Sequence, residues 1–223
     1  MAARSVVAQV SNLRHIRMLK VGLTGSIAVG KSFVLGILSE LGCRVLDADA
    51  TAREMVAAGT PGLKAVVEAF GTDVLTPAGE LDRARLGSLV FADEKKRLRL
   101  NSILHPFIIA AQDEQIREWE SEDPNGIAVI DAALMIESGG YRRFDKLIVV
   151  HCRPEVQLQR LMMRDGIRLE DAEKRIAAQM PQEEKKKFAD FLIDTSDGFE
   201  DARQQTEAVF RQLRKANSGT TAS

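Results

Sequence analysis

Short apolar runs alternate with stretches of helical periodicity along most of the chain. After Lys31, for example, apolar side chains recur on one helical face as far as Leu41, and Gly42 then ends the helix. Strands that alternate with helices predict an α/β fold, a parallel sheet between two helical layers. Five runs have the length and composition of buried strands: Leu19 to Thr24, Arg44 to Leu46, Gly126 to Asp131, Lys146 to Val150 and Ala189 to Asp194.

The segment between the second and third predicted strands is too long for a simple crossover. We interpret it as a helical substrate-binding insertion over about residues 51–122. Its predicted helices are Thr51 to Ala58, Pro61 to Phe70, Arg83 to Phe91 and Asp93 to Glu120, the last with a break at His105-Pro106.

A pair of helices is predicted between the fourth and fifth strands, over Leu158 to Arg164 and Arg168 to Lys187. The pair carries several arginines, which either form a solvated face or reach into a site. Arg160 and Arg164 are four residues apart and can point the same way. The run Lys185-Lys186-Lys187 follows two glutamates and is interpreted as a solvated face.

Composition limits the partners of this chain. It has 223 residues, 45% of them hydrophobic and 28% charged, enough for one sizeable domain with a full core. A net charge of -1 gives no global attraction to nucleic acid or to an anionic membrane. No apolar run approaches the roughly 18 residues that span a bilayer. Cys43 and Cys152 show no metal or redox spacing. We therefore expect a cytoplasmic protein without a nucleic-acid or membrane partner.

Both ends of the chain fall outside the periodic pattern. Residues 1–17 contain three arginines and no acid, and their apolar part is too short for a secretory signal. A disordered extension, a start site upstream of a functional start at Met18, and an organelle transit peptide remain open. We place the domain at residues 18–215 and expect residues 216–223 to be a disordered tail.

The segment Gly25-Ser26-Ile27-Ala28-Val29-Gly30-Lys31-Ser32 matches the phosphate-binding loop G-x-x-x-x-G-K-[ST], and it lies between a strand and a helix. Successive backbone N–H groups of such a loop surround the phosphates of ATP. Glycine is needed most at Gly25 and Gly30, whereas a Cβ at Ala28 and Val29 is tolerable if it points away. Lys31 should contact the outer phosphates, Ser32 should bind Mg²⁺, and Phe33 follows directly. The fold is therefore that of a P-loop NTPase.

The class of P-loop protein depends on other residues. The chain contains neither the Asn-Lys-x-Asp string of GTPases nor the Leu-Ser-Gly-Gly-Gln string of ABC ATPases. A small-molecule kinase needs a group that deprotonates the acceptor, and Asp47 and Asp49 lie on one side of the chain at the end of the second strand. Either could instead be a helix N-cap, Asp47 more readily than Asp49.

Seven segments together resemble the dephospho-coenzyme A kinase family, in order and in spacing, from about Met18 to about Gly198. The resemblance implies ATP-dependent phosphorylation of the 3′-hydroxyl of dephospho-CoA, the last step of CoA synthesis. It also implies a CoA-binding helical region at about 51–122 and a helical lid at about 160–188. The segments are LTGSIAVGKS, VLDADATAREMV, LDRARLGSLVF, LNSILHPFI, VIDAALMIESG, LQRLMMRDG and RIAAQMPQEEKKKFADFLIDTSDG.

The resemblance also assigns roles to individual residues. Asp49 would orient or deprotonate the acceptor hydroxyl, and Lys31 would stabilise the phosphoryl group, with Arg160 or Arg164 closing over it from the lid. Asp131 would hold Mg²⁺ through water. The acceptor pocket would be lined or supported by Arg53, Arg83, His105 and Glu137, although His105 beside Pro106 has an equally good structural explanation. The partners would be ATP and dephospho-CoA, and the protein would be a monomer or a weak oligomer.

Departures from the family pattern occur at two places. Most members are expected to have Gly-Gly-Ile-Gly-Ser-Gly-Lys-Ser in the loop, so Ser26, Ala28 and Val29 differ, and Ala133 stands where a proline is usual. A nucleoside or nucleotide kinase, and a nucleotide-binding regulatory or scaffold protein, are the two alternative functions.

Overall fold

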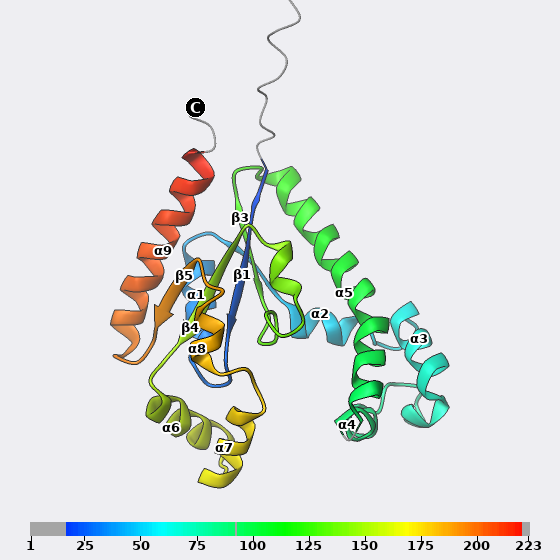
Figure 1. The fold of residues 1–223 in the computed structure, drawn as a ribbon. Coiled ribbons are helices and arrows are strands. Elements are labelled where there is room, and N and C mark those ends of the chain that lie inside the picture. The colour runs from blue at the N-terminus through cyan, green and yellow to red at the C-terminus, as the bar shows by residue number, and fades with distance from the viewer. Residues whose placement is uncertain (1–16, 92, 220–223) are drawn as a thin grey trace, which may run out of the picture.

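A single parallel sheet forms the centre of the molecule in a computed structural model that describes residues 17–91 and 93–219 (Figure 1). The order of its five strands is β2-β3-β1-β4-β5, so the predicted five-stranded parallel sheet is confirmed. The strands are β1 (Leu19–Gly25), β2 (Arg44–Asp47), β3 (Ile127–Asp131), β4 (Lys146–His151) and β5 (Phe191–Asp194).

Helices follow most strands, and two of them, α3 and α4, begin and end at the predicted residues. The helices are α1 (Lys31–Glu40), α2 (Ala48–Glu54), α3 (Pro61–Phe70), α4 (Arg83–Phe91), α5 (Glu94–Glu122), α6 (Pro154–Asp165), α7 (Leu169–Ala177), α8 (Gln182–Lys186) and α9 (Phe199–Gly219), with short 3₁₀ turns η1 (Thr72–Val74) and η2 (Gly140–Arg143).

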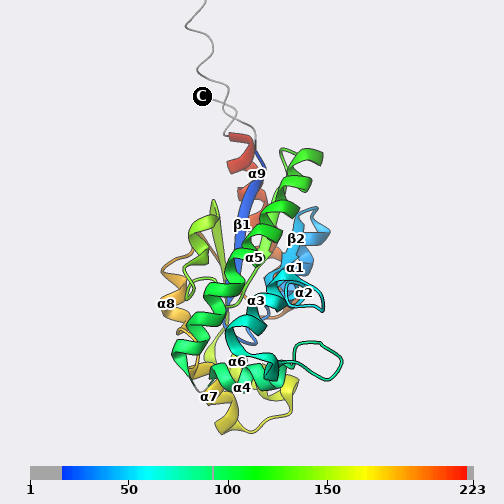
Figure 2. The same cartoon turned by 90° about the vertical axis from the view of Figure 1, so that its right-hand side faces the viewer.

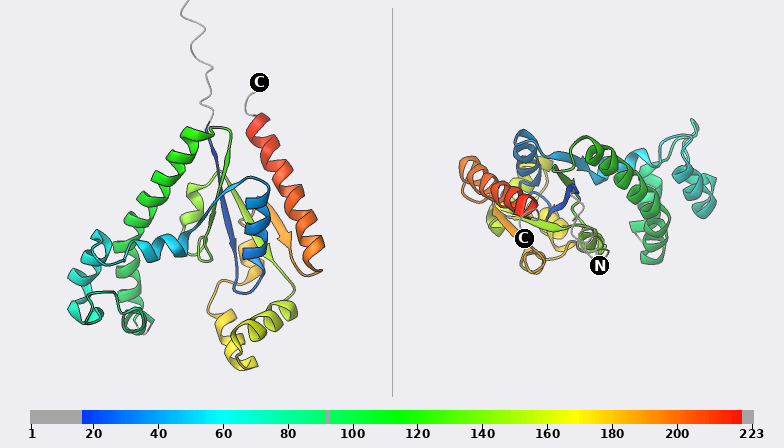
Figure 3. Two further views of the ribbon diagram at one scale, coloured as in Figure 1. Left: turned by 180° about the vertical axis from the view of Figure 1, so that it is seen from behind. Right: turned by 90° about the horizontal axis from the view of Figure 1, so that it is seen from above.

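Alternate residues of each central strand pack into different cores, one on each side of the sheet. In β3, Ile127 and Val129 pack with residues of α1 and α9, whereas Ala128 and Ile130 pack with Ile116 of α5. The views from behind and from above show these helices on both sides of the sheet (Figure 3). The arrangement is the three-layer fold predicted for parallel strands with continuous apolar sequence.

The insertion between β2 and β3 has a core of its own. Val56, Val66, Val74 and Leu86 are buried there, and α2, α3 and α4 all pack against α5 (Figure 2). Both α4 and the α6–α7 pair lie at the end of the molecule where the strands have their carboxyl ends (Figure 1). In open α/β sheets this end holds the ligand.

The predicted break at His105-Pro106 is wrong, because α5 continues through Pro106. Proline removes one N–H from the helix ladder but does not have to end a helix that is packed on both sides of it. Before Pro106, α5 contributes Leu104 to the core of the insertion, and after it, Ile116 to the core under the sheet.

Other boundaries also differ from the prediction. Arg168 to Lys187 forms two helices, α7 and α8, because Pro181 lies between them. The tail predicted to be disordered from residue 216 is helical as far as Gly219, since α9 packs along α1 and β5, and residues 220–223 lie outside the described residues.

At the amino end, the expectation of disorder concerns residues 1–16, which lie outside the described residues, and Arg17, which the structure places. The Arg17 guanidinium is paired with Asp145, and Met18 is fully buried. The described residues therefore begin one residue before the predicted start of the domain. No helix in the described part of the chain is long and apolar enough to cross a membrane.

Candidate active site

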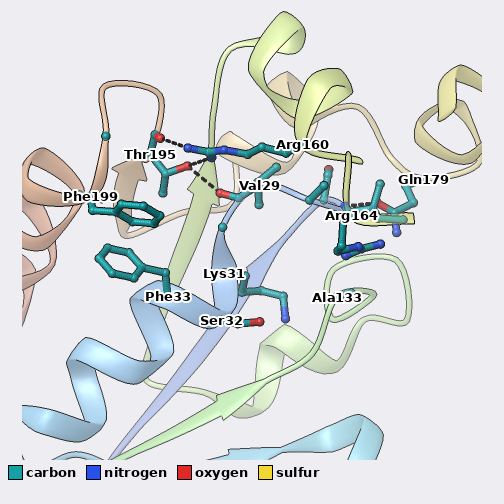
Figure 4. Close-up of a pocket in the computed structure, with 16 residues that line it drawn as sticks. Val29, Lys31, Ser32, Phe33, Ala133, Arg160, Arg164, Gln179, Thr195 and Phe199 are labelled. Carbon is teal, nitrogen blue, oxygen red and sulfur yellow. Dashed lines mark hydrogen bonds between the residues drawn. The ribbon is translucent and has the colours of Figure 1, made fainter. Parts of the chain in front are cut away.

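A cavity of about 600 Å³ lies over the carboxyl end of β1 (Figure 4). The phosphate loop and the start of α1 form one wall, and the opposite wall comes from α6, from the turn between α7 and α8 and from the segment between β5 and α9. The lining residues are Ser26, Ile27, Ala28, Val29, Gly30, Lys31, Ser32, Phe33, Ala133, Arg160, Arg164, Gln179, Thr195, Gly198, Phe199 and Ala202.

Glycine is required at the two loop positions that the sequence indicated. A Cβ on Gly25 would lie 2.5 Å from the backbone oxygen of Val150, which is far closer than real contacts allow. Gly30 has a φ of 87°, in the left-handed region, and a Cβ there would lie 3.2 Å from Thr195 Oγ1. Gly30 is also the N-cap of α1, so no side chain competes with a phosphate for the amino end of that helix.

Ala28 and Val29 fit the loop in different ways. Val29 has no exposed surface and packs into the core on the α1 side, so its side chain points away from the phosphate side as predicted. Ala28 has a φ of 60°, which L-residues other than glycine, asparagine and aspartate rarely adopt. The loop therefore keeps its shape although Ala28 is strained.

Lys31 and Asp131 form an ion pair in the floor of the site, between α1 and the end of β3. Burial raises the pKa of the Asp131 carboxyl above its ordinary value, the Lys31 ammonium opposes this shift, and the carboxylates of Asp47 and Asp49 add to it. Asp47 and Asp131 are register partners at the ends of β2 and β3, and Asp49 lies in the first turn of α2 that follows β2. With Lys31 paired to Asp131, the four side chains lie at one edge of the sheet although they come from three separate segments. A nearby positive charge, supplied by Lys31 in this structure, stabilises the ionised form of this group of carboxylates.

The two acids after β2 have different surroundings. Asp47 is the N-cap of α2, and its Oδ1 accepts hydrogen bonds from the N–H groups of Asp49 (2.7 Å) and Ala50 (3.2 Å). The helix-cap interpretation of Asp47 is therefore confirmed, and α2 begins earlier than predicted because of this cap. Asp49 lies in the first turn of α2 and is exposed.

The remaining residues assigned to the acceptor pocket lie outside the cavity walls described above. Arg53 Nη2 is 3.7 Å from Asp47 Oδ2, and Arg83 donates to the backbone oxygen of Arg53 (3.2 Å), so the structure brings these two arginines together at the edge of the insertion. His105 is an exposed residue of α5. Within residues 17–91 and 93–219, no hydrogen bond or ion pair links it to the other predicted site residues.

The arginines of α6 line the cavity and have partners of their own. Arg160 donates to Thr195 Oγ1 (2.9 Å) and to the backbone oxygen of Thr195 (2.7 Å) (Figure 4). Arg164 is paired with Asp165 through its Nε (2.7 Å). Thr195 in turn donates to the backbone oxygen of Val29 (2.7 Å). Arg160 is thereby connected to the phosphate loop through Thr195, and Arg164 lies nearer the turn that contains Gln179.

Lys185 corrects one prediction, because it is fully buried and does not belong to a solvated face. Its Nζ lies 2.8 Å from Glu137 Oε1 and donates to the backbone oxygen of Ala133 (2.8 Å). Glu137, predicted to line or support the acceptor pocket, also accepts a hydrogen bond from the Met180 N–H (3.4 Å). In this structure Glu137 therefore supports the segment after β3 and the turn before α8.

Sequence reasoning missed several residues that contact the loop or line the cavity. Gln157, Gln179 and Thr195 bond directly to the phosphate-loop backbone, and Phe199 packs on Phe33 with ring centroids 4.8 Å apart. Gln179 and Thr195 lie in one of the segments that carry the family resemblance, and this was the available signal for them. No local pattern marks Gln157 or Phe199, because their partners are far away in sequence.

The protein oxygens at this site are suited to a Mg²⁺ ion that takes most of its ligands from ATP and water. Within residues 17–91 and 93–219, no three His, Cys, Asp or Glu side chains are arranged as a metal cage. Mg²⁺ in phosphoryl-transfer sites needs no such cage, because it takes one or two protein oxygens together with phosphate and water. The Ser32 hydroxyl and the Asp131 carboxylate provide oxygens of this kind on adjacent elements.

Comparison with known proteins finds, over most of the chain, the same family that the seven sequence segments resemble. Residues 19–201 match the family model of dephospho-CoA kinase. The dephospho-CoA kinase of Streptomyces avermitilis is 44% identical over 88% of this chain and 94% of its own length, and that of Geobacter metallireducens is 42% identical over 90% and 99%. The solved structure of dephospho-CoA kinase from Campylobacter jejuni superimposes with a TM-score of 0.67 at 32% identity, covering 89% of this chain and 98% of that one.

Proposed function

This chain belongs to the dephospho-CoA kinase family, and on that premise we propose how its residues phosphorylate the 3′-hydroxyl of dephospho-CoA with ATP. The reaction gives CoA and ADP and is the final step of CoA biosynthesis. The observation that carries the residue-level proposal is the group formed by Lys31, Asp131, Asp47 and Asp49, which lies next to an intact phosphate loop at the carboxyl end of the sheet.

ATP binds with its phosphates in the loop between β1 and α1. The N–H groups of Ala28 to Ser32 and the amino end of α1 surround the β- and γ-phosphates, where the helix dipole favours negative charge. Phe33 and Phe199 supply an apolar surface at the other side of the cavity. The carbonyl of Val29 is held away from the phosphates by Thr195.

Lys31 changes partner during the cycle. In this structure its ammonium is paired with Asp131. When ATP binds, Lys31 contacts the γ-phosphate. The Ser32 hydroxyl and, through water, the Asp131 carboxylate would hold Mg²⁺, which would supply neutralising charge at the β- and γ-phosphates. Asp131 then keeps a positive neighbour in both states, which a buried carboxylate requires.

Asp49 accepts the proton of the acceptor hydroxyl. The ribose oxygen attacks the γ-phosphorus in line, the bond between that phosphorus and the β,γ-bridging oxygen breaks, and ADP leaves. Asp49 suits this role because its carboxylate is exposed beside the buried pair, whereas Asp47 is occupied as a helix cap. Arg164 and Arg160 of α6 neutralise the charge of the phosphoryl group in flight, with α6–α8 acting as a lid.

The CoA-binding region is the α2–α5 insertion, which has its own core and lies at the same end of the sheet as the phosphate loop. Arg53 and Arg83, held together at its edge, offer cations to the phosphates of dephospho-CoA. His105 of α5 and, from the segment after β3, Glu137 line or support the acceptor pocket. We also propose that the protein acts in the cytoplasm, as a monomer or weak oligomer.

The test is a coupled ADP-release assay across acceptors. Turnover should depend on dephospho-CoA, and AMP or nucleosides should give little. Strong phosphorylation of AMP or a nucleoside without dephospho-CoA turnover would instead indicate a nucleotide or nucleoside kinase. ATP binding without any acceptor-stimulated turnover would indicate a regulatory nucleotide-binding protein.

A further inference from the structure

Two glutamine side chains hold one residue of the phosphate loop from both sides. The Ile27 N–H donates to Gln179 Oε1 (2.7 Å), and Gln157 Nε2 donates to the backbone oxygen of Ile27 (2.8 Å). Gln157 belongs to α6 and is 2% exposed, and Gln179 belongs to the turn between α7 and α8. Both polar groups of Ile27 are therefore satisfied by the part of the chain proposed as the lid.

Neighbouring backbone groups determine which atom of each side-chain amide, the oxygen or the nitrogen, faces Ile27 in Gln157 and Gln179. A backbone N–H can only donate a hydrogen bond, and a backbone carbonyl can only accept one. The Cys152 N–H donates to Gln182 Oε1 (3.0 Å), so Gln182 Nε2 is the group that faces Gln157 Oε1 (2.8 Å). Gln157 Nε2 must then face the Ile27 carbonyl. In the same way the Ile27 N–H requires the oxygen of Gln179. A continuous chain of amides thus runs from the end of β4 to the loop.

The position of these bonds matters because Ala28 follows Ile27. Ala28 is the residue other than glycine that has a positive φ in the described part of the chain. The peptide between Ile27 and Ala28 is trans, so the Ala28 N–H points opposite to the Ile27 carbonyl. If Ala28 relaxed to a negative φ, this peptide would rotate. The Ala28 N–H would then no longer point toward the phosphate that the loop binds.

We propose that Gln157 and Gln179 are positioning residues for the ATP site: Gln157 holds the Ile27–Ala28 peptide, Gln179 holds the Ser26–Ile27 peptide before it, and the two bonds together fix Ile27 against relaxation of Ala28. This inference rests on the proposed function of the loop as the ATP site. The two glutamines of the α6–α8 region thus restrain the backbone at Ala28. With glycine at position 28 this restraint would be unnecessary, since glycine adopts a positive φ without strain. ATP affinity in this chain then depends on contacts between the lid helices and the loop.

Two variants on the same helix separate this effect from a general loss of stability. Gln157→Met keeps the length of the side chain and removes both the hydrogen bond to Ile27 and the one from Gln182, whereas Gln159→Met alters an exposed glutamine of α6. Binding of the β,γ-imido analogue of ATP with Mg²⁺ is measured by calorimetry. We expect Gln157→Met to weaken binding about tenfold, because the Ile27 carbonyl in the loop then loses its buried hydrogen-bond donor. Gln159→Met should not change it.

Kinetics supply a second readout. In Gln157→Met the KM for ATP should rise about tenfold, with kcat and the KM for dephospho-CoA close to those of the unmodified chain. A merely structural defect would instead reduce the active fraction and leave both KM values unchanged. If Gln157→Met does not fold, Gln179→Met, at the cavity wall, serves for the same measurements.

The decisive experiment is a double-mutant cycle with Ala28→Gly. In the Ala28→Gly background, Gln157→Met should weaken analogue binding less than about threefold, because there is little strain left to restrain. Equal losses in both backgrounds, or no loss in either, would overturn the proposal. Binding of the analogue needs no acceptor, so a failure of the proposed kinase reaction would appear separately, as absent ADP release by the unmodified chain.

Discussion

Lys185 donates a hydrogen bond to the backbone oxygen of Ala133 over 2.8 Å, from a position with no exposed side-chain surface. Thr24 Oγ1 donates to the same oxygen (3.2 Å). Ala133 lines the cavity and stands where the family pattern usually has a proline. Two donors therefore fix the backbone of a segment that lacks the rigidity of proline.

Lys185→Met should lower the free energy of unfolding by about 2 kcal/mol or more, because it leaves the Glu137 carboxylate without its buried cation and removes one of the two donors to the Ala133 carbonyl. Chemical denaturation measures this change. Lys187→Met is the matched control, since Lys187 is two-thirds exposed and pairs with exposed Glu184 in the same helical run. It should change stability by less than about 0.5 kcal/mol. Equal effects would show that the buried bonds of Lys185 contribute nothing.

The sequence predicted the parts of this molecule that depend on local pattern. The five strands, helices α3 and α4, and the need for glycine at Gly25 and Gly30 all follow from residues that are close together in the chain. Lys185 could not be predicted in this way, because a run of three lysines after two glutamates has the same local pattern whether or not one of them is buried. Its partner Ala133 lies 52 residues away.

The same limit applies to the site. The loop motif identified a place for ATP, but the side chains that hold the loop, such as Gln157 and Thr195, come from contacts over more than a hundred residues. The break predicted at Pro106 failed for a related reason, since packing on both sides of that residue outweighs the loss of one helix hydrogen bond.

Asp49→Asn should reduce kcat at least about a hundredfold while leaving ATP binding nearly unchanged, because a general base typically contributes that much and asparagine cannot accept the proton. Initial rates of ADP release and calorimetric titration with the ATP analogue measure the two quantities. Asp47→Asn is the control, since asparagine caps helices as well as aspartate does. It should retain most of the activity. If Asp49→Asn kept most of its rate, Asp49 would not be the base.

Ser26→Ala tests a hydroxyl that is peculiar to this loop. Among the residues described, Ser26 Oγ is a buried side-chain atom without a hydrogen-bond partner. Removing such a group should leave the free energy of unfolding unchanged or raise it by about 1 kcal/mol, because an unsatisfied buried hydroxyl costs stability. Thermal denaturation measures the change. A clear loss of ATP affinity in the same variant would show that this hydroxyl acquires a partner when ATP binds.

Ala28→Gly and Val29→Ser should differ in stability although they change neighbouring loop residues. Ala28→Gly removes the cost of a left-handed alanine, roughly 1 kcal/mol, but adds nearly the same cost through the flexibility of glycine in the unfolded chain. Its free energy of unfolding should stay within about 1 kcal/mol of the original. Val29→Ser places a hydroxyl in a core position with no exposed surface, so it should lose about 2 kcal/mol or more.

Kinetics on the same two variants test the division of roles between the loop and the acceptor residues. Neither change touches Asp49 or the insertion, so both variants should keep dephospho-CoA as the preferred acceptor, with Ala28→Gly changing the KM for ATP by less than about fivefold. ADP release across dephospho-CoA, AMP and nucleosides measures this preference. A variant that turned to another acceptor would mean that residues 28 and 29 shape the acceptor site as well as the ATP site, contrary to the packing of the Val29 side chain into the core.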